Sequence, residues 1–258
     1  MDSPRGPGVR RVFSAAIVLA AIFALSVAGL IPPSPKPADA PGSDFSAIRA
    51  WSALRRILGP DVPHPVGSPA DEDVRARIVD ELTRLGYRPQ VQTGFACSTL
   101  GSCATVNNVV ARLDGYEPGA AVLLAAHYDS VPAGPGDSDD GTGVASALEI
   151  ARALKSLSAP RHSVIFLLDE GEEAGLLGAR AFVDSNPWAK DVRAAVNLDA
   201  RGTSGPSLMF ETGSANRWAV RLFARSTTRP ATSSIFYTAY QYIPNDTDFS
   251  VFKAAYYQ

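Results

Sequence analysis

The fold follows from AVLLAAHYD at residues 121–129, an apolar run that leads directly into a histidine and, two residues later, an aspartate. Two later runs have the same form, SVIFLLD at 163–169 and AAVNLD at 194–199, and each ends in an aspartate. Apolar runs without regular polar alternation are typical of strands that are buried on both faces. The segments 142–157 and 176–186, between these runs, have the apolar spacing of helices. Strands that alternate with helices predict an α/β domain with a mainly parallel, mixed sheet, flanked by helices on both faces.

The same domain is expected to extend on both sides of these runs. No internal repeat divides the chain, and the apolar spacing in 44–58 and 70–85 predicts two helices before the first strand. Further strands are predicted at 88–93, 105–113 and 207–210. We therefore expect residues 44–258 to form one domain.

The composition is that of a globular protein without a strongly charged surface. The chain has 258 residues, of which 24 are Lys or Arg and 26 are Asp or Glu, so its formal charge is −2. Apolar residues make up 46% and charged residues 19%. Because nucleic-acid binding needs a basic surface that displaces counterions, we expect no nucleic-acid partner.

An apolar segment precedes the domain. Residues 12–31 are almost all apolar, Arg10 and Arg11 lie just before them, and a Pro-rich stretch at 32–43 follows. A helix of this length reaches about 30 Å, the hydrocarbon thickness of a bilayer. The positive-inside rule places residues 1–11 in the cytoplasm. We therefore expect a single-pass membrane anchor, with the domain in the periplasm, outside the cell or in a lumen.

A cleaved export signal is the alternative to a retained anchor. Ala38-Asp39-Ala40 has the small residues of a cleavage site, and Arg10-Arg11 loosely resembles a twin-arginine signal. Cleaved signals have a shorter apolar region of about 7–15 residues, so the length favours an anchor. Both alternatives export the domain.

Export affects the expected oxidation state of the two cysteines in the sequence, Cys97 and Cys103. A disulfide persists outside the cytoplasm, and the intervening residues are enough to close a small loop. Two free thiols remain the alternative. No histidine lies near them, which argues against a zinc site there.

Ionisable residues gather where the apolar runs end. They are His127, Asp129, Asp169, Glu170, Glu172, Glu173 and Asp199. The carboxyl ends of parallel strands meet at one edge of a sheet, and a Gly- and Pro-rich loop at 130–143 would bring Asp139 or Asp140 to the same edge. Crowded carboxylates repel each other unless a cation lies among them. A set of His, Asp and Glu without Cys suits zinc or a similar divalent ion.

These motifs together resemble the co-catalytic di-zinc aminopeptidase family, whose relatives include glutamate carboxypeptidase, the transferrin-receptor ectodomain and glutaminyl cyclase. The similarity is greatest to a membrane-anchored subgroup of vacuolar and endoplasmic-reticulum metallopeptidases, with bacterial counterparts. It covers most of residues 44–252 and implies a zinc-exopeptidase fold. The matching segments are HYDS at 127–130, GDSDDGTG at 136–143, EEAGLLG at 172–178 and NLD at 197–199.

The resemblance implies a set of metal ligands. Asp139 would bridge two zinc ions. His127 and Asp199 would complete the ligands of the first ion, and Glu173 would bind the second.

The resemblance also implies two residues that act beside the metal. Glu172 would be the general base that takes a proton from the metal-bound water. Asp129 would accept a hydrogen bond from the second ring nitrogen of His127 and fix the tautomer of that histidine.

One family ligand has no counterpart in this chain. The family supplies a second histidine, late in the domain, to the zinc ion held by Glu173, but no histidine follows His162 here. His162 lies at the start of a predicted strand and His64 in a Pro-flanked turn, so neither is expected at the site. The first zinc site therefore has all its protein ligands, whereas the second has only Asp139 and Glu173. We expect one zinc ion to bind firmly and the other weakly.

The segment NDTDF at 245–249 resembles the part of the subgroup that precedes this histidine. The chain ends nine residues after Phe249, from which we expect the domain to be incomplete at its C-terminus. Asp246 and Asp248 are candidates for recognition of the substrate amine or for bonds to ligating residues. A position on a surface loop is the alternative for both.

The sequence thus predicts an exported, membrane-anchored zinc aminopeptidase that acts on peptides. A glutaminyl-cyclase-type acyltransferase is one alternative, because that class uses a related edge but usually a single zinc ion. A receptor-like ectodomain that has the fold without the chemistry is the other. The retained Asp139 and the Glu172-Glu173 pair favour hydrolysis.

Overall fold

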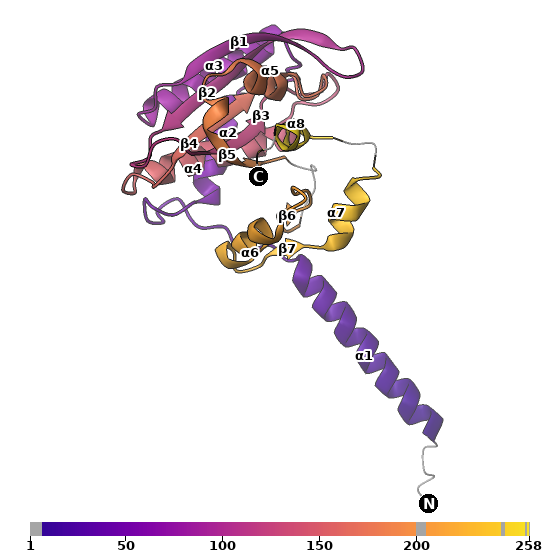
Figure 1. Cartoon of the computed structure of the whole chain (residues 1–258). Helices are drawn as coiled ribbons and strands as arrows, with labels where there is room; N and C mark the ends of the chain where they lie inside the picture. The colour runs from indigo at the N-terminus through magenta and orange to yellow at the C-terminus, as the bar shows by residue number, and fades with distance from the viewer. Residues whose placement is uncertain (1–6, 200–204, 244–245, 256, 258) are drawn as a thin grey trace, which may run out of the picture.

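The computed structural model describes residues 7–199, 205–243, 246–255 and 257. A long helix, α1 (Pro7–Leu30), projects away from the rest of the chain (Figure 1). Its segment Arg11–Gly29 is long and apolar enough to cross a membrane, and none of it is buried. The apolar helix expected at 12–31 is therefore present, as a candidate membrane span.

A five-stranded sheet forms the centre of the domain, in the order β1-β2-β4-β3-β5. β3 pairs in parallel with β4 and β5, whereas β2 runs antiparallel to both β1 and β4. Only β2 therefore opposes the common strand direction, which confirms the mainly parallel, mixed sheet. The strands are β1 (Gln90–Cys97), β2 (Cys103–Leu113), β3 (Ala121–His127), β4 (Ser163–Asp169) and β5 (Val192–Asn197).

Helices cover both faces of this sheet (Figure 1). On one face are α2 (Ala47–Leu58), α3 (Pro69–Arg84) and α4 (Thr142–Lys155), and on the other are α5 (Leu177–Ser185) and α8 (Asp248–Ala254). Short helical segments occur at Asp137–Gly141 and Ala189–Asp191.

A hydrophobic core lies on each face of the sheet, which explains why the central strands have apolar residues at nearly every position. Leu124 and Phe166 pack toward α2, α3 and α4, whereas their neighbours Leu123 and Ile165 pack toward α5 and α8. Successive side chains of a strand point to opposite faces, so a strand with a core on each side needs apolar residues throughout.

The Pro-rich segment at 32–43 lies partly against the domain. Ser46 Oγ donates a hydrogen bond to the Lys36 carbonyl at 2.9 Å, and Arg49 Nη1 donates one to the Ala38 carbonyl at 2.8 Å. Both donors come from the start of α2, so this helix holds the second half of the segment.

Residues 205–243 form a smaller part that we call the C-terminal lobe. It contains β6 (Leu208–Met209), α6 (Arg217–Ser226), β7 (Ala231–Thr232) and α7 (Ser234–Tyr240). β6 and β7 pair in parallel as a separate two-stranded sheet, so the strand predicted at 207–210 is present as β6 but lies outside the main sheet. The lobe lies at the end of the globular part nearest to α1 (Figure 1).

Cys97 and Cys103 form a disulfide. The two residues are register partners at the tip of the β1–β2 hairpin, so the bond closes this hairpin. Of the two states that the sequence allows, the structure contains the oxidised one.

Candidate metal centre

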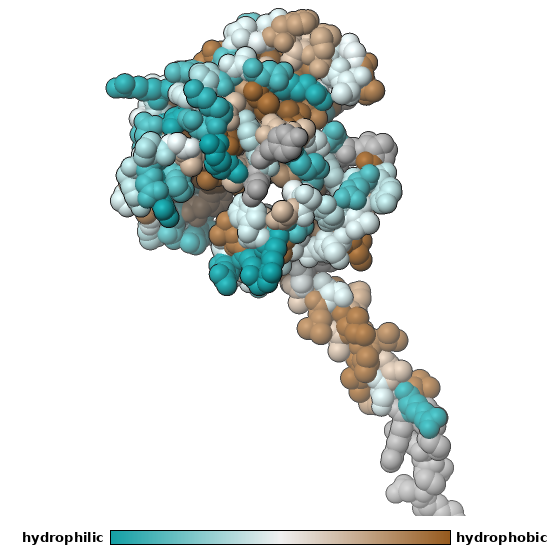
Figure 2. Space-filling view, viewed as in Figure 1, coloured by the Kyte–Doolittle hydropathy of each residue, from teal (hydrophilic) through white to brown (hydrophobic). Residues whose placement is uncertain are grey.

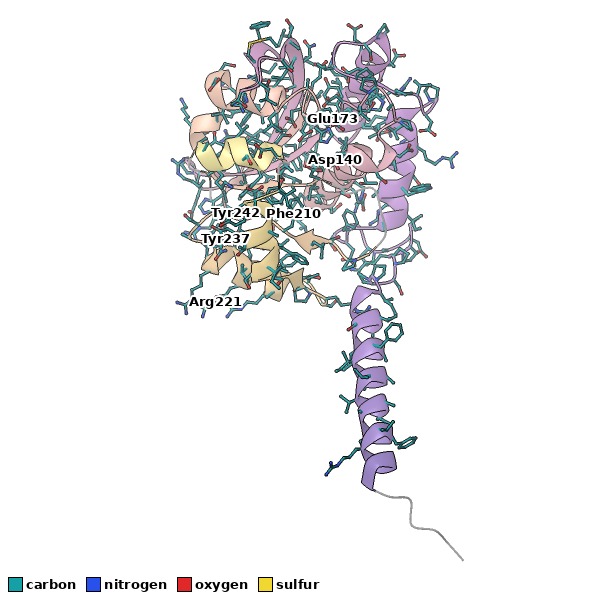
Figure 3. The ribbon with its side chains drawn as sticks, turned by 90° about the vertical axis from the view of Figure 1, so that its right-hand side faces the viewer. Asp140, Glu173, Phe210, Arg221, Tyr237 and Tyr242 are labelled. Carbon is teal, nitrogen blue, oxygen red and sulfur yellow. A yellow bond between two sulfur atoms is a disulfide. The ribbon has the colours of Figure 1, made fainter. Side chains whose placement is uncertain are left out.

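The candidate site lies at the edge where β3, β4 and β5 end. His127 at the end of β3 is the register partner of Asp169 at the end of β4, and Asp199 follows β5 by two residues. The loop after β4 carries Glu172 and Glu173. In Figure 3, Glu173 and Asp140 both lie in the half of the domain away from α1.

Two groups of side chains at this edge have the spacing of metal ligands. One ligand atom from each of His127, Asp139 and Asp199 lies within 4.8 Å of the others. The same holds for His127, Glu172 and Glu173. The four residues predicted as metal ligands thus fall into two groups that share His127, and Glu173 lies in one group with the predicted base Glu172.

His127 is held so that one ring nitrogen faces the carboxylates. Its Nδ1 lies 3.1 Å from the main-chain carbonyl oxygen of Asp129 and 3.5 Å from Asp129 Oδ1. Its Nε2 lies 3.3 Å from Asp139 Oδ1. A proton on Nδ1, donated to Asp129, leaves the lone pair of Nε2 free for a metal ion. The main-chain carbonyl and the side-chain carboxylate of Asp129 thus both offer an acceptor to Nδ1 of His127, and the carbonyl oxygen is the nearer of the two.

Asp129 also connects His127 to the loop that carries the glutamates. Its Oδ1 accepts a hydrogen bond from the main-chain N–H of Glu172 at 3.1 Å. The Asp129 side chain is almost fully buried. One carboxylate therefore lies against the imidazole of His127 and fixes the backbone at Glu172.

The structure distinguishes between Asp139 and Asp140, which the sequence leaves open. Asp139 is half-exposed and faces His127. Asp140 turns inward, where its Oδ1 accepts a hydrogen bond from Gly143 N at 3.1 Å at the start of α4. A Cβ atom at Gly143 would collide with this carboxylate, so glycine is required there. The peptide bond between the two aspartates is cis.

The electrostatics of the edge favour added positive charge. Burial, and then the charge of Asp248, raise the pKa of Glu172 to about 9. Burial and the neighbouring carboxylates, Asp139 first, also raise the pKa of Glu173. Among the described residues, no lysine or arginine forms an ion pair with either glutamate.

His127 supplies only part of the positive charge that these carboxylates need. Burial lowers the pKa of His127, but hydrogen bonds to Asp129 and Asp139 outweigh burial and raise it. An imidazole nitrogen with several carboxylate oxygens is a donor set that zinc binds in proteins. The residues present therefore fit a zinc site.

Neither of the other two histidines joins these groups. His64 is buried beside the loop, where its Nδ1 donates to the Val62 carbonyl at 2.9 Å and its main-chain N–H donates to Ser130 Oγ at 2.8 Å. His162 precedes β4, at the opposite end of the sheet from His127. Within the described parts of the chain, the ligand groups contain His127 and no other histidine.

Sequence reasoning missed the role of Glu170. This residue is fully buried, and its carboxylate accepts hydrogen bonds from Gly67 N at 3.0 Å and Asn107 N at 2.5 Å. Burial, and then Glu170 itself, raise the pKa of Asp71 on α3 to about 10, so Asp71 holds a proton and faces Glu170. The four acids of DEGEE at 169–173 resemble a solvated turn in the sequence. Only the three-dimensional contacts show that Glu170 fastens the loop after β4, which carries Glu172 and Glu173 and which we call the metal-site loop, to β2.

Asp248 is the second acid whose place the sequence left undecided. It is buried at the start of α8, where its carboxyl group faces that of Asp169. Its charge is one of the causes of the raised pKa of Glu172. Asp248 thus lies behind the site rather than on a surface loop. Asp246 lines a cavity of about 610 Å³. Asn245 lies outside the described residues.

Comparisons with known proteins agree with this geometry. The model of peptidase family M28 matches residues 108–258. The human endoplasmic reticulum metallopeptidase 1 is 33% identical over 230 residues, which cover 81% of this chain and 25% of the relative. The vacuolar membrane protease of Candida dubliniensis is 33% identical over 218 residues, 80% of this chain and 23% of the relative. The chain thus spans about a quarter of the length of these relatives.

Solved structures share the fold at lower identity. A Zn-dependent exopeptidase from Parabacteroides distasonis has a TM-score of 0.62 and 19% identity, over 83% of this chain and 82% of its own. Glutaminyl cyclase from an Acidobacteriales bacterium has a TM-score of 0.64 and 19% identity, over 86% and 80%. The family model covers more than half of the chain, and the human relative matches four fifths of it. We conclude that the chain belongs to peptidase family M28.

Proposed function

We propose that this chain is an aminopeptidase, which removes residues from the N-terminus of peptides outside the cytoplasm. The observation that carries the proposal is the pair of ligand groups that share His127, one with Asp139 and Asp199 and the other with Glu172 and Glu173. Membership of family M28 supports the reaction class, hydrolysis of a peptide bond.

The first group supports one set of ligand roles: His127 Nε2, Asp139 and Asp199 would hold one zinc ion. The family resemblance implies that Asp139 with Glu173 would hold a second ion more weakly, whereas in the structure Glu173 groups with His127 and Glu172. Zinc, when bound, would polarise the scissile carbonyl and lower the pKa of the attacking water to about 7. Asp129 orients the imidazole of His127 and thereby the direction of Nε2.

Glu172 would move the proton. Its main-chain N–H is held by Asp129, and a carboxylate oxygen of Glu172 lies within 4.8 Å of ligand atoms of both His127 and Glu173. The Glu172 carboxylate would take a proton from the attacking water and pass it to the leaving amine nitrogen. Added positive charge lowers the pKa of Glu172 from about 9, which keeps this carboxylate ionised at neutral pH.

The test uses matched peptides with free and with acetylated N-termini. An aminopeptidase is expected to release the first residue of the free peptides and to leave the acetylated ones intact. Cleavage of both at equal rates would contradict exopeptidase action. The Glu172→Gln variant gives the background, because it lacks the base but retains the fold.

Glutaminyl-cyclase-type acyl transfer is the second candidate. The observation in its favour is that the group of His127, Asp139 and Asp199 by itself offers three ligands to one zinc ion, the number of ions that this class usually uses. A peptide that begins with glutamine separates the two reactions. Loss of ammonia with the peptide otherwise intact would support the cyclase, and release of free glutamine would support the peptidase.

We further propose that α1 is a retained single-pass anchor with residues 1–11 in the cytoplasm and the domain of residues 44–258 across the membrane. The length and apolarity of Arg11–Gly29 support this placement, as do the membrane proteins among its relatives. Alkaline carbonate extraction of membranes tests it together with the intact mass. A mature protein that begins after Ala40 and appears in the soluble fraction would show a cleaved signal instead.

A further inference from the structure

The C-terminal lobe has an exposed surface that the proposed reaction does not use. No residue of α6 or α7 is buried. Large apolar side chains are open to solvent on this lobe: Trp218, Leu222, Ile235, Phe236, Tyr242 and Ile243. Side chains of this size in one region mark a surface that contacts a partner.

Helix α6 combines these apolar side chains with arginines in a regular way. Arg217, Arg221 and Arg225 repeat every four residues and therefore form one row along the helix. Trp218 and Leu222 form the next row, and both rows are exposed. Figure 2 shows strongly hydrophilic and hydrophobic atoms next to each other at the position of α6. We call these five residues the α6 face.

The charge of the lobe is strongly one-sided. Residues 205–243 contain four arginines and a single acid, Glu211, although the whole chain has a formal charge of −2. Glu211 is occupied by an ion pair with Lys253 of α8. Within the described residues, the guanidinium groups of the α6 face form no hydrogen bond or ion pair. The face therefore presents unneutralised positive charge.

The lobe is also tied to the end of α1. Arg229 Nη1 donates a hydrogen bond at 2.7 Å to the carbonyl of Ile31, the residue after α1 ends. In Figure 1, α6 lies near this end of α1, and Figure 3 shows Arg221 at the lower edge of the lobe, the edge beyond which α1 projects. A bilayer crossed by α1 would have its surface next to this edge, because membrane-spanning helices tilt by only about 20° from the bilayer normal.

We propose that the α6 face lies on the surface of the membrane that α1 crosses, where its arginines bind the anionic headgroups of phospholipids. Trp218 and Leu222 would enter the boundary between headgroups and acyl chains, as the apolar side of an interfacial helix does. The arginine side chains are long enough to lie along this boundary with their charges among the headgroups. The proposal rests on α1 being the retained anchor. It implies that the domain does not swing freely but is held with the candidate metal centre directed away from the membrane.

The test measures quenching of tryptophan fluorescence in the full chain, reconstituted in vesicles that contain brominated phosphatidylcholine and phosphatidylglycerol. The chain has three tryptophans, Trp51, Trp188 and Trp218. The double variant Trp51→Phe/Trp188→Phe reports on the α6 face, and Trp188→Phe/Trp218→Phe reports on Trp51, which is more solvent-exposed than Trp218 (58% against 42%) but lies on α2. A third variant replaces all three and introduces Phe23→Trp into α1.

The expected pattern separates the two proposals. Bromine near the glycerol end of the acyl chains should quench Trp218 at least about twofold and leave Trp51 unaffected, while deep bromine should quench the tryptophan at position 23. Quenching at position 23 without quenching of Trp218 would overturn the membrane contact and leave the anchor intact. No quenching at position 23 would overturn the anchor itself. Emission of Trp218 that is blue-shifted but unquenched would show that a second protein copy or another protein covers the face, and would also overturn the proposal.

The arginines are tested in the variant that retains only Trp218. Arg221→Gln/Arg225→Gln should reduce its quenching, whereas the control Arg55→Gln/Arg88→Gln, at exposed positions outside the lobe, should not. Neutral vesicles without phosphatidylglycerol should reduce the quenching of the unsubstituted face in the same way. Equal quenching in neutral and anionic vesicles would contradict headgroup recognition by the arginines.

Discussion

At the scale of single residues, the candidate site depends on a division of tasks between neighbours. Asp139 faces His127 while Asp140 caps α4, and Asp129 binds the main-chain N–H of Glu172 while Glu172 and Glu173 both bring a carboxylate oxygen to His127. The sequence placed all these residues at one edge, because strand ends are predictable from apolar runs. It did not separate Asp139 from Asp140, because that depends on the local backbone path of the loop.

The Glu172→Gln variant tests the base at this scale. The amide cannot accept a proton, so we expect kcat to fall about 10²–10⁴-fold, while zinc content stays that of the unsubstituted protein. Steady-state kinetics and metal analysis by mass spectrometry measure the two quantities. Glu72→Gln, on the exposed side of α3, is the control and should leave both unchanged. Full activity in Glu172→Gln would remove the base assignment.

Asp71 offers a pH-dependent test away from the metal ligands. Its pKa is raised from 3.8 to about 10 in the folded protein, mainly by burial. The folded state therefore keeps a proton that the unfolded state loses above pH 4, so this contribution to stability is complete below about pH 4 and falls as pH rises toward 10.

The Asp71→Asn variant cannot ionise and should lose this dependence. We expect it to gain stability relative to the unsubstituted protein between pH 5 and pH 9, by at least about 1 kcal/mol. Urea unfolding at the two pH values gives both free energies of unfolding. If the free energy of unfolding depended on pH in the same way in both proteins, Asp71 would not hold the proton.

At the scale of elements, the β1–β2 hairpin is fastened at its tip. The Cys97–Cys103 disulfide closes it, and the adjacent Ser98 packs so closely on Gly175 that a Cβ atom there would collide with it. Gly175 has φ +117°, a conformation that only glycine adopts readily, and it lies in the loop that carries the two glutamates. The hairpin tip thus supports the metal-site loop.

Removal of this disulfide should lower stability without removing zinc. Loop-closure entropy for a ring of this length predicts a loss of about 2 kcal/mol in the free energy of unfolding for Cys97→Ser/Cys103→Ser. Chemical denaturation of the zinc-loaded protein measures the loss. A variant as stable as the parent would mean that the hairpin is held by its packing alone.

The elements that the sequence predicted well are those with a long apolar pattern. The helices predicted at 70–85 and 142–157 and the strand at 163–168 match α3, α4 and β4 within two residues. The strand predicted at 88–93 lies instead at Gln90–Cys97, because half of β1 is exposed and lacks an apolar run. α7 and α8 have seven residues each, and too few turns repeat in them for a period to stand out, whereas α6 was missed although its arginines recur every four residues.

At the scale of the whole molecule, metal binding and folding are expected to be coupled. The ligands come from the ends of two strands and from two loops, so a bound ion joins parts of the chain that are far apart in sequence. A ligand at 100 times its dissociation constant stabilises the folded state by about 2.7 kcal/mol. A chelator should therefore lower the melting temperature, and added zinc should restore it. Equal melting temperatures would contradict the coupling.

The number of ions is a separate expectation for the whole chain. With His127, Asp139 and Asp199 at one site and only Asp139 and Glu173 at the other, zinc titration should resolve one tight and one weak step. Asp199→Asn should weaken the tight step, and Glu173→Gln the weak one. Two equally tight ions would mean that a further residue completes the second site.

The central claim is that the crowded carboxylates beside His127 are tolerated because a divalent ion binds among them. Anomalous diffraction at the zinc edge, from crystals of the zinc-loaded protein, tests it most directly. The account predicts a zinc peak at about 2.0–2.2 Å from Nε2 of His127 and from oxygens of Asp139 and Asp199. Zinc located elsewhere, with the imidazole of His127 hydrogen-bonded only to protein groups, would contradict it.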